Sequence, residues 1–168
     1  MVYTTEQYLL DRQLIEDTIH KLWMFLDLKL STTDFVSRCV NEVFASRIHV
    51  DYAVLFGHGE PQDISAREQA EQWSVLLGKM DGCLHHTGAV LPDLPVPDGK
   101  IGLPDTTTVH TKAITVMRRG ECVAQNGCVM ELVLRRIADL KGNGWRIVST
   151  KVITKAFDIG DAQGVFAA

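Results

Sequence analysis

Four side chains that can move protons stand on otherwise apolar stretches far apart in the chain. Asp27 ends the run LWMFLD, and Tyr52 lies in RIHVDYAVL. His86 lies in HHTGAVL, and His110 begins a long strand-like segment. Acidic, phenolic and imidazole groups that meet in a buried site are the components of general acid–base catalysis. The residue types therefore indicate a reaction in which a proton is removed and returned.

Asp27 is expected on the buried face of a long helix. Ile15, Ile19 and Trp23 precede it on a single i, i+4 row of the helix. A carboxylate on such a face is costly unless it is paired. This pattern favours an Asp27 that faces a pocket; the alternative is that position 27 falls near the helix end and reaches water.

Tyr52 and Asn126 are expected to point inward from strands. Tyr52 alternates with Ile48 and Val50 in the segment 47–55, and Asn126 shares a face with apolar residues in the segment 121–137. A buried tyrosine can serve as core, and a buried amide can tie a sheet together. Each can also hold a substrate oxygen, and the sequence leaves these alternatives open.

The histidines are placed by the same alternation. His86 is expected on the inner face with Val90, and His85 on the outer face. His110 is expected on the inner face with Ile114. A lone histidine on an apolar face is more often a hydrogen-bonded core residue, but two of them with an acid and a phenol favour a base that works near neutral pH.

No competing chemistry is visible in the sequence. His20, His49 and His58 form no metal-ligand spacing, and no GxGxxG, Walker-type or GxSxG segment occurs. The four cysteines form no CxxC pair and are expected as free thiols. Among them only Cys83 lies near a histidine, two residues before His85. We expect no cofactor, no metal ion and no covalent nucleophile.

Length and charge narrow the class of protein. A chain of 168 residues is expected to form one domain, 1–168. A net charge of −4 with scattered basic residues argues against a nucleic-acid partner. No run reaches about 18 apolar residues, and the N-terminus lacks a secretory pattern. The chain is therefore expected to be cytoplasmic, without a membrane span.

The elements that must position these residues follow the order helix, helix, strand, helix and strand meander. Helices are predicted over 5–30, 33–44 and 65–77, with a strand over 47–55. Strands are then predicted over 85–91, 107–118, 121–137 and 144–155, with a long loop over 92–105. Early helices and late strands indicate an α+β fold in which one curved antiparallel sheet wraps around the long N-terminal helix.

This element order and several local segments resemble scytalone dehydratase and the wider SnoaL-like group, small enzymes with the nuclear transport factor 2-like cone fold. The segments are FLDLKLSTTDFVSR, RIHVDYAVLFG, HHTGAV and VHTKAITV. The resemblance covers residues 5–159. It implies a cone-shaped sheet, no cofactor, a small-molecule substrate and a homo-oligomer, either a dimer or a trimer.

The resemblance also implies roles for individual residues. His110 corresponds to the catalytic histidine, Asp27 to the aspartate that orients it, and His86 to a second acid–base histidine. Tyr52 corresponds to a tyrosine that holds a water against the substrate carbonyl. Asn126 corresponds to a polar residue that grips a substrate hydroxyl.

Trp23 and Leu26, on the predicted first helix, are expected to contact the substrate. Leu26 stands where the dehydratase has a second water-holding tyrosine, which argues against scytalone itself as the substrate. The resemblance implies a dehydratase or isomerase that acts beside a carbonyl on a polyketide-like intermediate of secondary metabolism. The alternatives are a polyketide cyclase, which would use the same groups for aldol closure, and a non-catalytic module that binds a ligand or partner.

Overall fold

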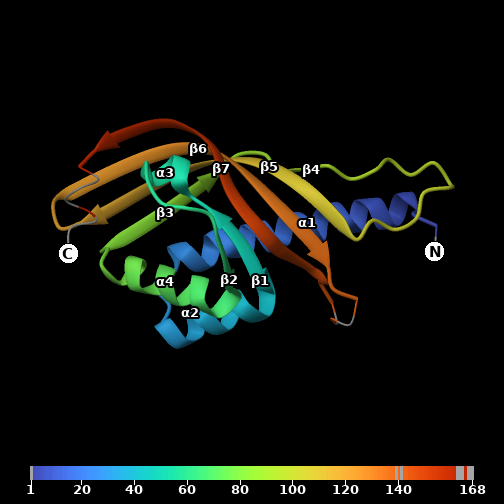
Figure 1. Cartoon of the computed structure of the whole chain (residues 1–168), viewed down its shortest axis with the longest axis horizontal. Coiled ribbons are helices and arrows are strands. Elements are labelled where there is room, and N and C mark those ends of the chain that lie inside the picture. The colour runs from blue at the N-terminus through green and yellow to red at the C-terminus, as the bar shows by residue number, and fades with distance from the viewer. Residues whose placement is uncertain (1, 139, 141, 162–164, 166–168) are drawn as a thin grey trace.

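The computed structural model describes residues 2–138, 140, 142–161 and 165, which form a curved sheet over one long helix (Figure 1). In chain order the elements are α1 (Thr5–Asp27), α2 (Thr32–Arg38), the π-helical turn η1 (Cys39–Val43), β1 (Phe44–Asp51), α3 (Ala53–Phe56), β2 (Gln62–Ser65), α4 (Ala66–Gly78), β3 (Gly82–Thr87), β4 (Leu91–Pro92), β5 (Thr106–Arg119), β6 (Cys122–Arg136) and β7 (Trp145–Gly160).

The sheet has the order β2-β1-β7-β6-β5-β3, and β4 pairs with β5 outside this path. From β3 to β7 each neighbouring pair is antiparallel, so the predicted α+β fold and its strand meander are confirmed. β1 joins β7 in parallel, a pairing that the sequence did not predict. In Figure 1 the long strands arch over α1, with α2 and α4 on the same side of the sheet.

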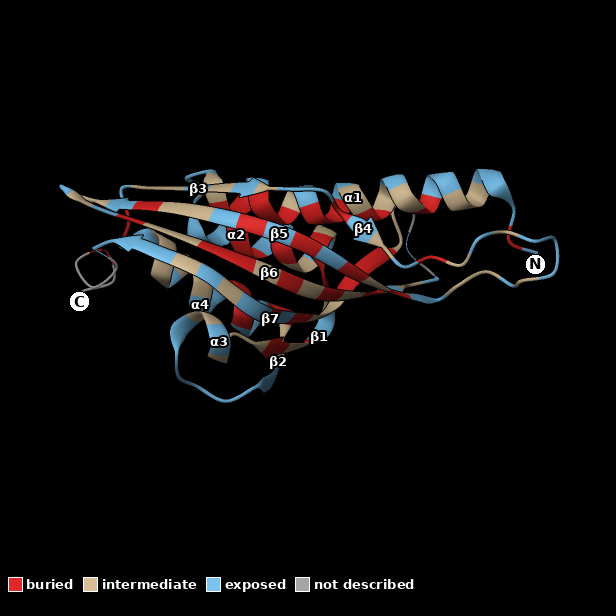
Figure 2. Ribbon diagram, turned by 90° about the horizontal axis from the view of Figure 1, so that it is seen from above, coloured by how far each residue is buried: buried red, intermediate tan, exposed pale blue. Residues whose placement is uncertain are grey.

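Helix α1 begins where the side chain of Thr4 accepts the backbone N–H of Gln7. Its inner face carries fully buried residues that include Ile15, Ile19 and Phe25. Figure 2 shows buried positions on α1 and along β5, β6 and β7, and α1 contacts the sheet through β3 and β7. Burying a side chain of this size contributes about 1.5–3 kcal/mol. None of the helices within the described residues is long and apolar enough to cross a membrane.

A buried carboxylate fixes the N-terminal half of α1. Asp11 has no exposed surface and accepts hydrogen bonds from Gln7, from the indole of Trp145 and from the guanidinium of Arg136. A buried charge is tolerated when donors surround it in this way. Asp11 therefore has a structural role, because its hydrogen bonds hold α1 against Arg136 and Trp145. Asp27, at the far end of the same helix, is not part of this network.

One local difference from the sequence prediction affects the site and lies at the end of β1. The predicted strand 47–55 ends at Asp51, and Ala53–Phe56 form the helical turn α3 instead. Gly57 ends this turn with φ 75°, a conformation that favours glycine. Tyr52 thus sits at the junction between a strand and a turn, where its side chain can reach the space between α4 and the sheet.

Candidate active site

Asp27 and His85 form a hydrogen-bonded pair at the end of α1. The Asp27 Oδ1 atom lies 2.6 Å from His85 Nδ1. Both carboxylate oxygens also lie 2.9 Å from the backbone nitrogen of His85, which donates to them. The two side chains retain only 20% and 10% of their exposed surface. Asp27 is turned inward rather than toward water, and its partner is His85, through which it reaches the candidate active site.

The inward placement expected for His86 is wrong. His86 is exposed, and its neighbour on the same face, Leu84, is 59% exposed. The expectation took its direction from Val90, which is buried. Strand β3 ends at Thr87, so alternation does not carry through residues 88–90. The burial of Val90 therefore does not indicate which way the side chain of His86 points.

His110 also lies outside the pocket. Its side chain is 51% exposed and pairs with Glu131 on the outer face of the sheet, with 3.4 Å between Nε2 and Oε2. The buried face of β5 carries Val109 and Ala113, with exposed fractions of 0% and 3%. The expectation failed because both faces of β5 carry apolar residues: Ile114, which shares the face of His110, is 39% exposed.

The His85 ring is held in one orientation. Trp23 stacks on it, with 4.9 Å between ring centroids and 27° between ring planes. Because the carboxylate of Asp27 can only accept, the proton on the neutral imidazole belongs on Nδ1. Nε2 then carries the lone pair. Trp23, expected as a substrate contact, lines the same pocket and also fixes the base.

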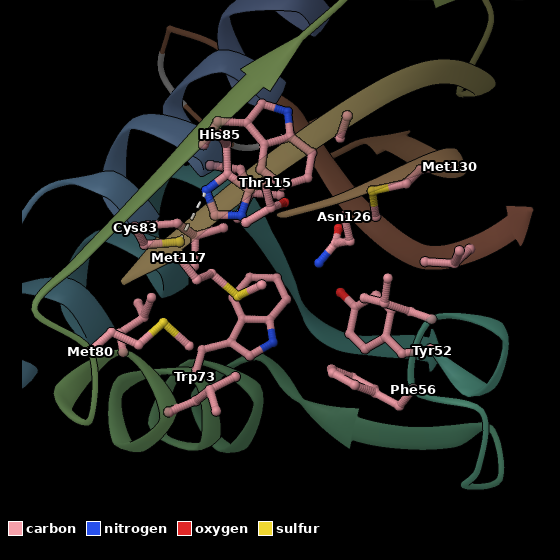
Figure 3. A pocket seen from close by; sticks show the side chains of 18 residues that line it. Tyr52, Phe56, Trp73, Met80, Cys83, His85, Thr115, Met117, Asn126 and Met130 are labelled. Atoms are coloured by element: carbon pink, nitrogen blue, oxygen red, sulfur yellow. Dashed lines mark hydrogen bonds between the residues drawn. The ribbon is translucent and has the colours of Figure 1, made fainter. Parts of the chain in front are cut away.

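A cavity of about 120 Å³ adjoins this pair between α1, α4 and the concave face of the sheet. Its walls are mainly apolar and rich in aromatic rings and sulfur, as Figure 3 shows. They include Phe56, Trp73, Met80, Met117 and Met130. None of the described side chains around it is lysine, arginine, aspartate or glutamate. The cavity therefore suits a neutral and largely apolar molecule.

Tyr52 presents a phenol to the cavity. Its hydroxyl accepts a hydrogen bond from Thr150 Oγ1 at 3.1 Å, and its ring stacks on Trp73 with 6.1 Å between centroids. Burial raises the pKa of Tyr52 above its ordinary value of 10.0. The hydroxyl thus keeps its proton near neutral pH and can donate it in a hydrogen bond.

Three further side chains that line the cavity are Asn126, Thr115 and Leu26. Asn126 on β6 and Thr115 on β5 are opposite one another in the strand register, and both face the cavity. Leu26 on α1 also lines it. In Figure 3 the ends of Asn126 and Tyr52 point into the same space, opposite His85. An imidazole thus stands on one side of an apolar pocket, and amide and phenol groups stand on the other.

Cys83 adjoins the pair on β3. Its Sγ atom lies 3.8 Å from His85 Nδ1. Burial, followed by the charge of Asp27, raises the pKa of the Cys83 thiol to about 12. The thiol is therefore protonated near neutral pH and a poor nucleophile. Asp27, Cys83 and His85 are also the one group in the described part of the chain whose ligand atoms lie close enough to hold a metal ion.

Five residues that the sequence interpretation assigned to the site lie at or beside this cavity, whereas His85 and Thr115 were not among its candidates. Asp27 reaches the pocket through His85, whereas Trp23, Leu26, Tyr52 and Asn126 line it directly. One signal could have found His85. Cys83 shares its face, and cysteine is among the most often buried residue types, so the odd positions of this strand are good candidates for the inner face.

Comparisons with known proteins give similarity in structure and none in sequence. No protein-family model and no curated protein matches the chain. The Kfla4162 protein from Kribbella flavida is similar in structure, with a TM-score of 0.73 and 17% identity over 94% of this chain and 97% of that one.

Two similar structures carry names of enzymes. A proposed scytalone dehydratase from Novosphingobium aromaticivorans has a TM-score of 0.67 and 11% identity, covering 93% of this chain and 91% of that one. The hexachlorocyclohexane dehydrochlorinase LinA-type3 from Novosphingobium barchaimii has a TM-score of 0.58 and 12% identity, covering 91% and 94%. At these identities the likeness establishes the fold alone, the nuclear transport factor 2-like cone fold that the resemblance implied.

Proposed function

We propose that the protein is a cofactor-free acid–base enzyme that removes a proton beside a carbonyl group, as a dehydratase or an isomerase. The observation that carries this proposal is the Asp27–His85 pair, 2.6 Å apart beside a cavity of about 120 Å³. A module that only binds a partner would have no need of an imidazole fixed in this way. Two of the similar structures are named as a dehydratase and a dehydrochlorinase, which supports elimination as the reaction class.

His85 is the base in this proposal, in place of His110. Nε2 takes a proton from the carbon beside the carbonyl, and the electron pair of the broken C–H bond moves to the carbonyl oxygen. Asp27 stabilises the imidazolium that forms. A positioned base of this kind contributes about 10²–10⁴-fold in rate.

Tyr52 and Asn126 are the donors that stabilise the enolate oxygen. The protonated phenol and the side-chain amide can each donate one hydrogen bond into the cavity, in apolar surroundings that strengthen it. One preorganised donor of this type is worth about 3 kcal/mol in the transition state. Thr115 can hold a second oxygen of the substrate.

A single histidine completes the reaction. In dehydration the enolate re-forms the carbonyl, a C=C bond forms, and the β-hydroxyl leaves with the proton that His85 returns from Nε2. In isomerisation His85 returns the proton to another carbon. The first course releases one water and the second does not. Both require the abstracted proton and its destination to lie on the same side of the substrate.

The lining indicates the substrate class. Aromatic rings, methionine side chains and the absence of charged groups among the described lining residues suit a neutral aromatic ketone, such as a polyketide-like intermediate. A carboxylate, phosphate or coenzyme A thioester would find no cation in these walls to pair with.

The test is a panel of aromatic β-hydroxy ketones incubated with the protein in deuterated water. We expect deuterium at the carbon beside the carbonyl, measured by mass spectrometry, with or without loss of water. Loss of water identifies a dehydratase, and deuterium at another carbon in a product of the same formula identifies an isomerase. A folded protein that accelerates neither exchange nor loss of water for any of these ketones, although they bind in its pocket, contradicts the proposal.

A further inference from the structure

Three potential metal ligands meet at the end of α1. Cys83 and His85 are two residues apart on β3 and so share one face of the strand. Asp27 faces them from the last residue of α1. One ligand atom from each side chain lies within 4.8 Å of the other two. The proposed acid–base reaction uses two of these groups and leaves the thiol without a role.

The spacing of these atoms is close to that of a coordination sphere. Tetrahedral bonds to Zn²⁺ of roughly 2.0–2.3 Å place a sulfur and a nitrogen ligand about 3.6 Å apart. Cys83 Sγ and His85 Nδ1 are 3.8 Å apart. Asp27 Oδ1 and His85 Nδ1, at 2.6 Å, would separate by about 0.8 Å to reach the ligand spacing set by those bonds. A small rotation of one carboxylate is enough for that.

An ion can reach these groups from a second side. A separate cavity of about 230 Å³ is lined by Asp27 and Cys83 and also by Thr32 and Ser74. Cys83 lines both this cavity and the candidate active site. The three ligands therefore stand in the wall between two spaces, and the fourth position of a tetrahedral ion is open to water or to a bound molecule.

We propose that Asp27, Cys83 and His85 bind one thiophilic divalent cation, Zn²⁺ or Cd²⁺, and that the bound ion switches off the acid–base pair. Binding releases the proton of the Cys83 thiol to solvent, so that the sulfur coordinates as a thiolate. Thiolate and imidazole ligands select such ions over Mg²⁺ and Ca²⁺, which prefer all-oxygen sites. Three protein ligands with one open position are sufficient for a stable zinc site.

The effect on the base follows from the imidazole. A metal on His85 Nδ1 uses the lone pair of that nitrogen, so the ring proton must reside on Nε2. Nε2–H is a donor and can no longer accept a proton from a substrate. Asp27 is at the same time withdrawn from the ring. This second half of the inference depends on the proposed function, whereas binding of the ion does not.

The binding test uses Cd²⁺ with tag-free protein, because cadmium–thiolate bonds absorb in the ultraviolet. We expect one Cd²⁺ per chain with this absorption and no response to Mg²⁺. The absorption should disappear in Cys83→Ser and persist in Cys122→Ser, a matched control whose thiol is also partly buried. Asp27→Asn, which leaves the thiol in place, should weaken binding by at least about tenfold.

The outcomes separate the two halves. For each protein, the rate of deuterium exchange with Cd²⁺ is compared with the rate of that same protein without metal. A rate that falls in proportion to the bound Cd²⁺ supports the switch. Cd²⁺ bound through Cys83 with exchange intact overturns the switch. An absorption equal in Cys83→Ser and wild type, with both folded by circular dichroism, or no absorption at all, overturns the metal site. A protein that binds Cd²⁺ through Cys83 but exchanges no substrate proton without metal leaves the metal site standing and removes the proposed function.

Discussion

The substitution Asp27→Asn should remove the base while it preserves the shape of the site. Asp27 Oδ1 faces His85 Nδ1 at 2.6 Å, and both oxygens face the backbone N–H of His85 at 2.9 Å. An asparagine has one acceptor for these donors. With its oxygen toward Nδ1, its NH₂ group opposes the backbone N–H. With its NH₂ group toward Nδ1, the oxygen accepts from the backbone, and the ring proton must move to Nε2.

The second orientation is favoured because it leaves no donors opposed. It puts a proton on the nitrogen that should act as base. The corresponding aspartate-to-asparagine change in a Ser-His-Asp triad costs about 10⁴-fold for this tautomeric reason. With a positioned base worth about 10²–10⁴-fold, we expect exchange to slow by about 10³-fold, or about 4 kcal/mol in the activation barrier.

The assay is deuterium incorporation beside the carbonyl, with circular dichroism as the check on folding. Asp11→Asn is the matched control, since it alters a buried carboxylate about 24 Å away along the same helix. That variant loses the charge on Asp11 that pairs with Arg136, and its free energy of unfolding should fall while the rate per folded molecule stays unchanged. A folded Asp27→Asn protein with the wild-type rate would refute the tautomer argument.

Three further predictions concern the oxyanion donor, the core and assembly. Tyr52→Phe should slow exchange by about 10²-fold, because water can partly replace the hydroxyl; an unchanged rate would exclude Tyr52 as a donor. Burial raises the pKa of Cys39 from 9.0 to about 12, so its contribution to stability is complete below pH 9 and is lost as the pH rises toward 12. Between pH 8 and pH 10, urea unfolding should therefore show a loss of stability roughly 1 kcal/mol smaller in Cys39→Ala than in wild type, and equal losses would contradict the shift. Val123 and Ile153, 43% and 41% exposed, leave apolar surface on the sheet, and we expect a homo-oligomer. Light scattering at the monomer mass of 18.7 kDa would contradict this.

The sequence predicted what depends on local patterns. Alternation along β5 and β6 and the helical row that ends at Asp27 were sufficient for the α+β fold and its antiparallel meander. The helix predicted over 65–77 is α4, and in the structure Ser65 and Glu68 form a capping box at its start. The parallel pairing of β1 with β7 joins residues about 100 positions apart, and no local pattern encodes it.

The candidate site shows where local patterns stop. Alternation separates two faces but does not say which is the inner one, so His85 and His86 could be told apart only by what packs on them. His85 stacks on Trp23 and is hydrogen-bonded to Asp27, which lies 58 positions earlier in the chain. The burial of Val90, beyond the end of β3, pointed to the wrong histidine. Tyr52 and Asn126 faced the pocket as expected because each stands next to a strand face with a continuous apolar row.

The central claim is that the Asp27–His85 pair, and neither outer histidine, moves the proton. The most direct measurement compares deuterium exchange by His85→Gln, His86→Gln and His110→Gln, each checked for folding. We predict that His85→Gln loses exchange by at least about 10²-fold and that the other two keep the wild-type rate. Full exchange in folded His85→Gln, or loss in His86→Gln or His110→Gln, would contradict this account.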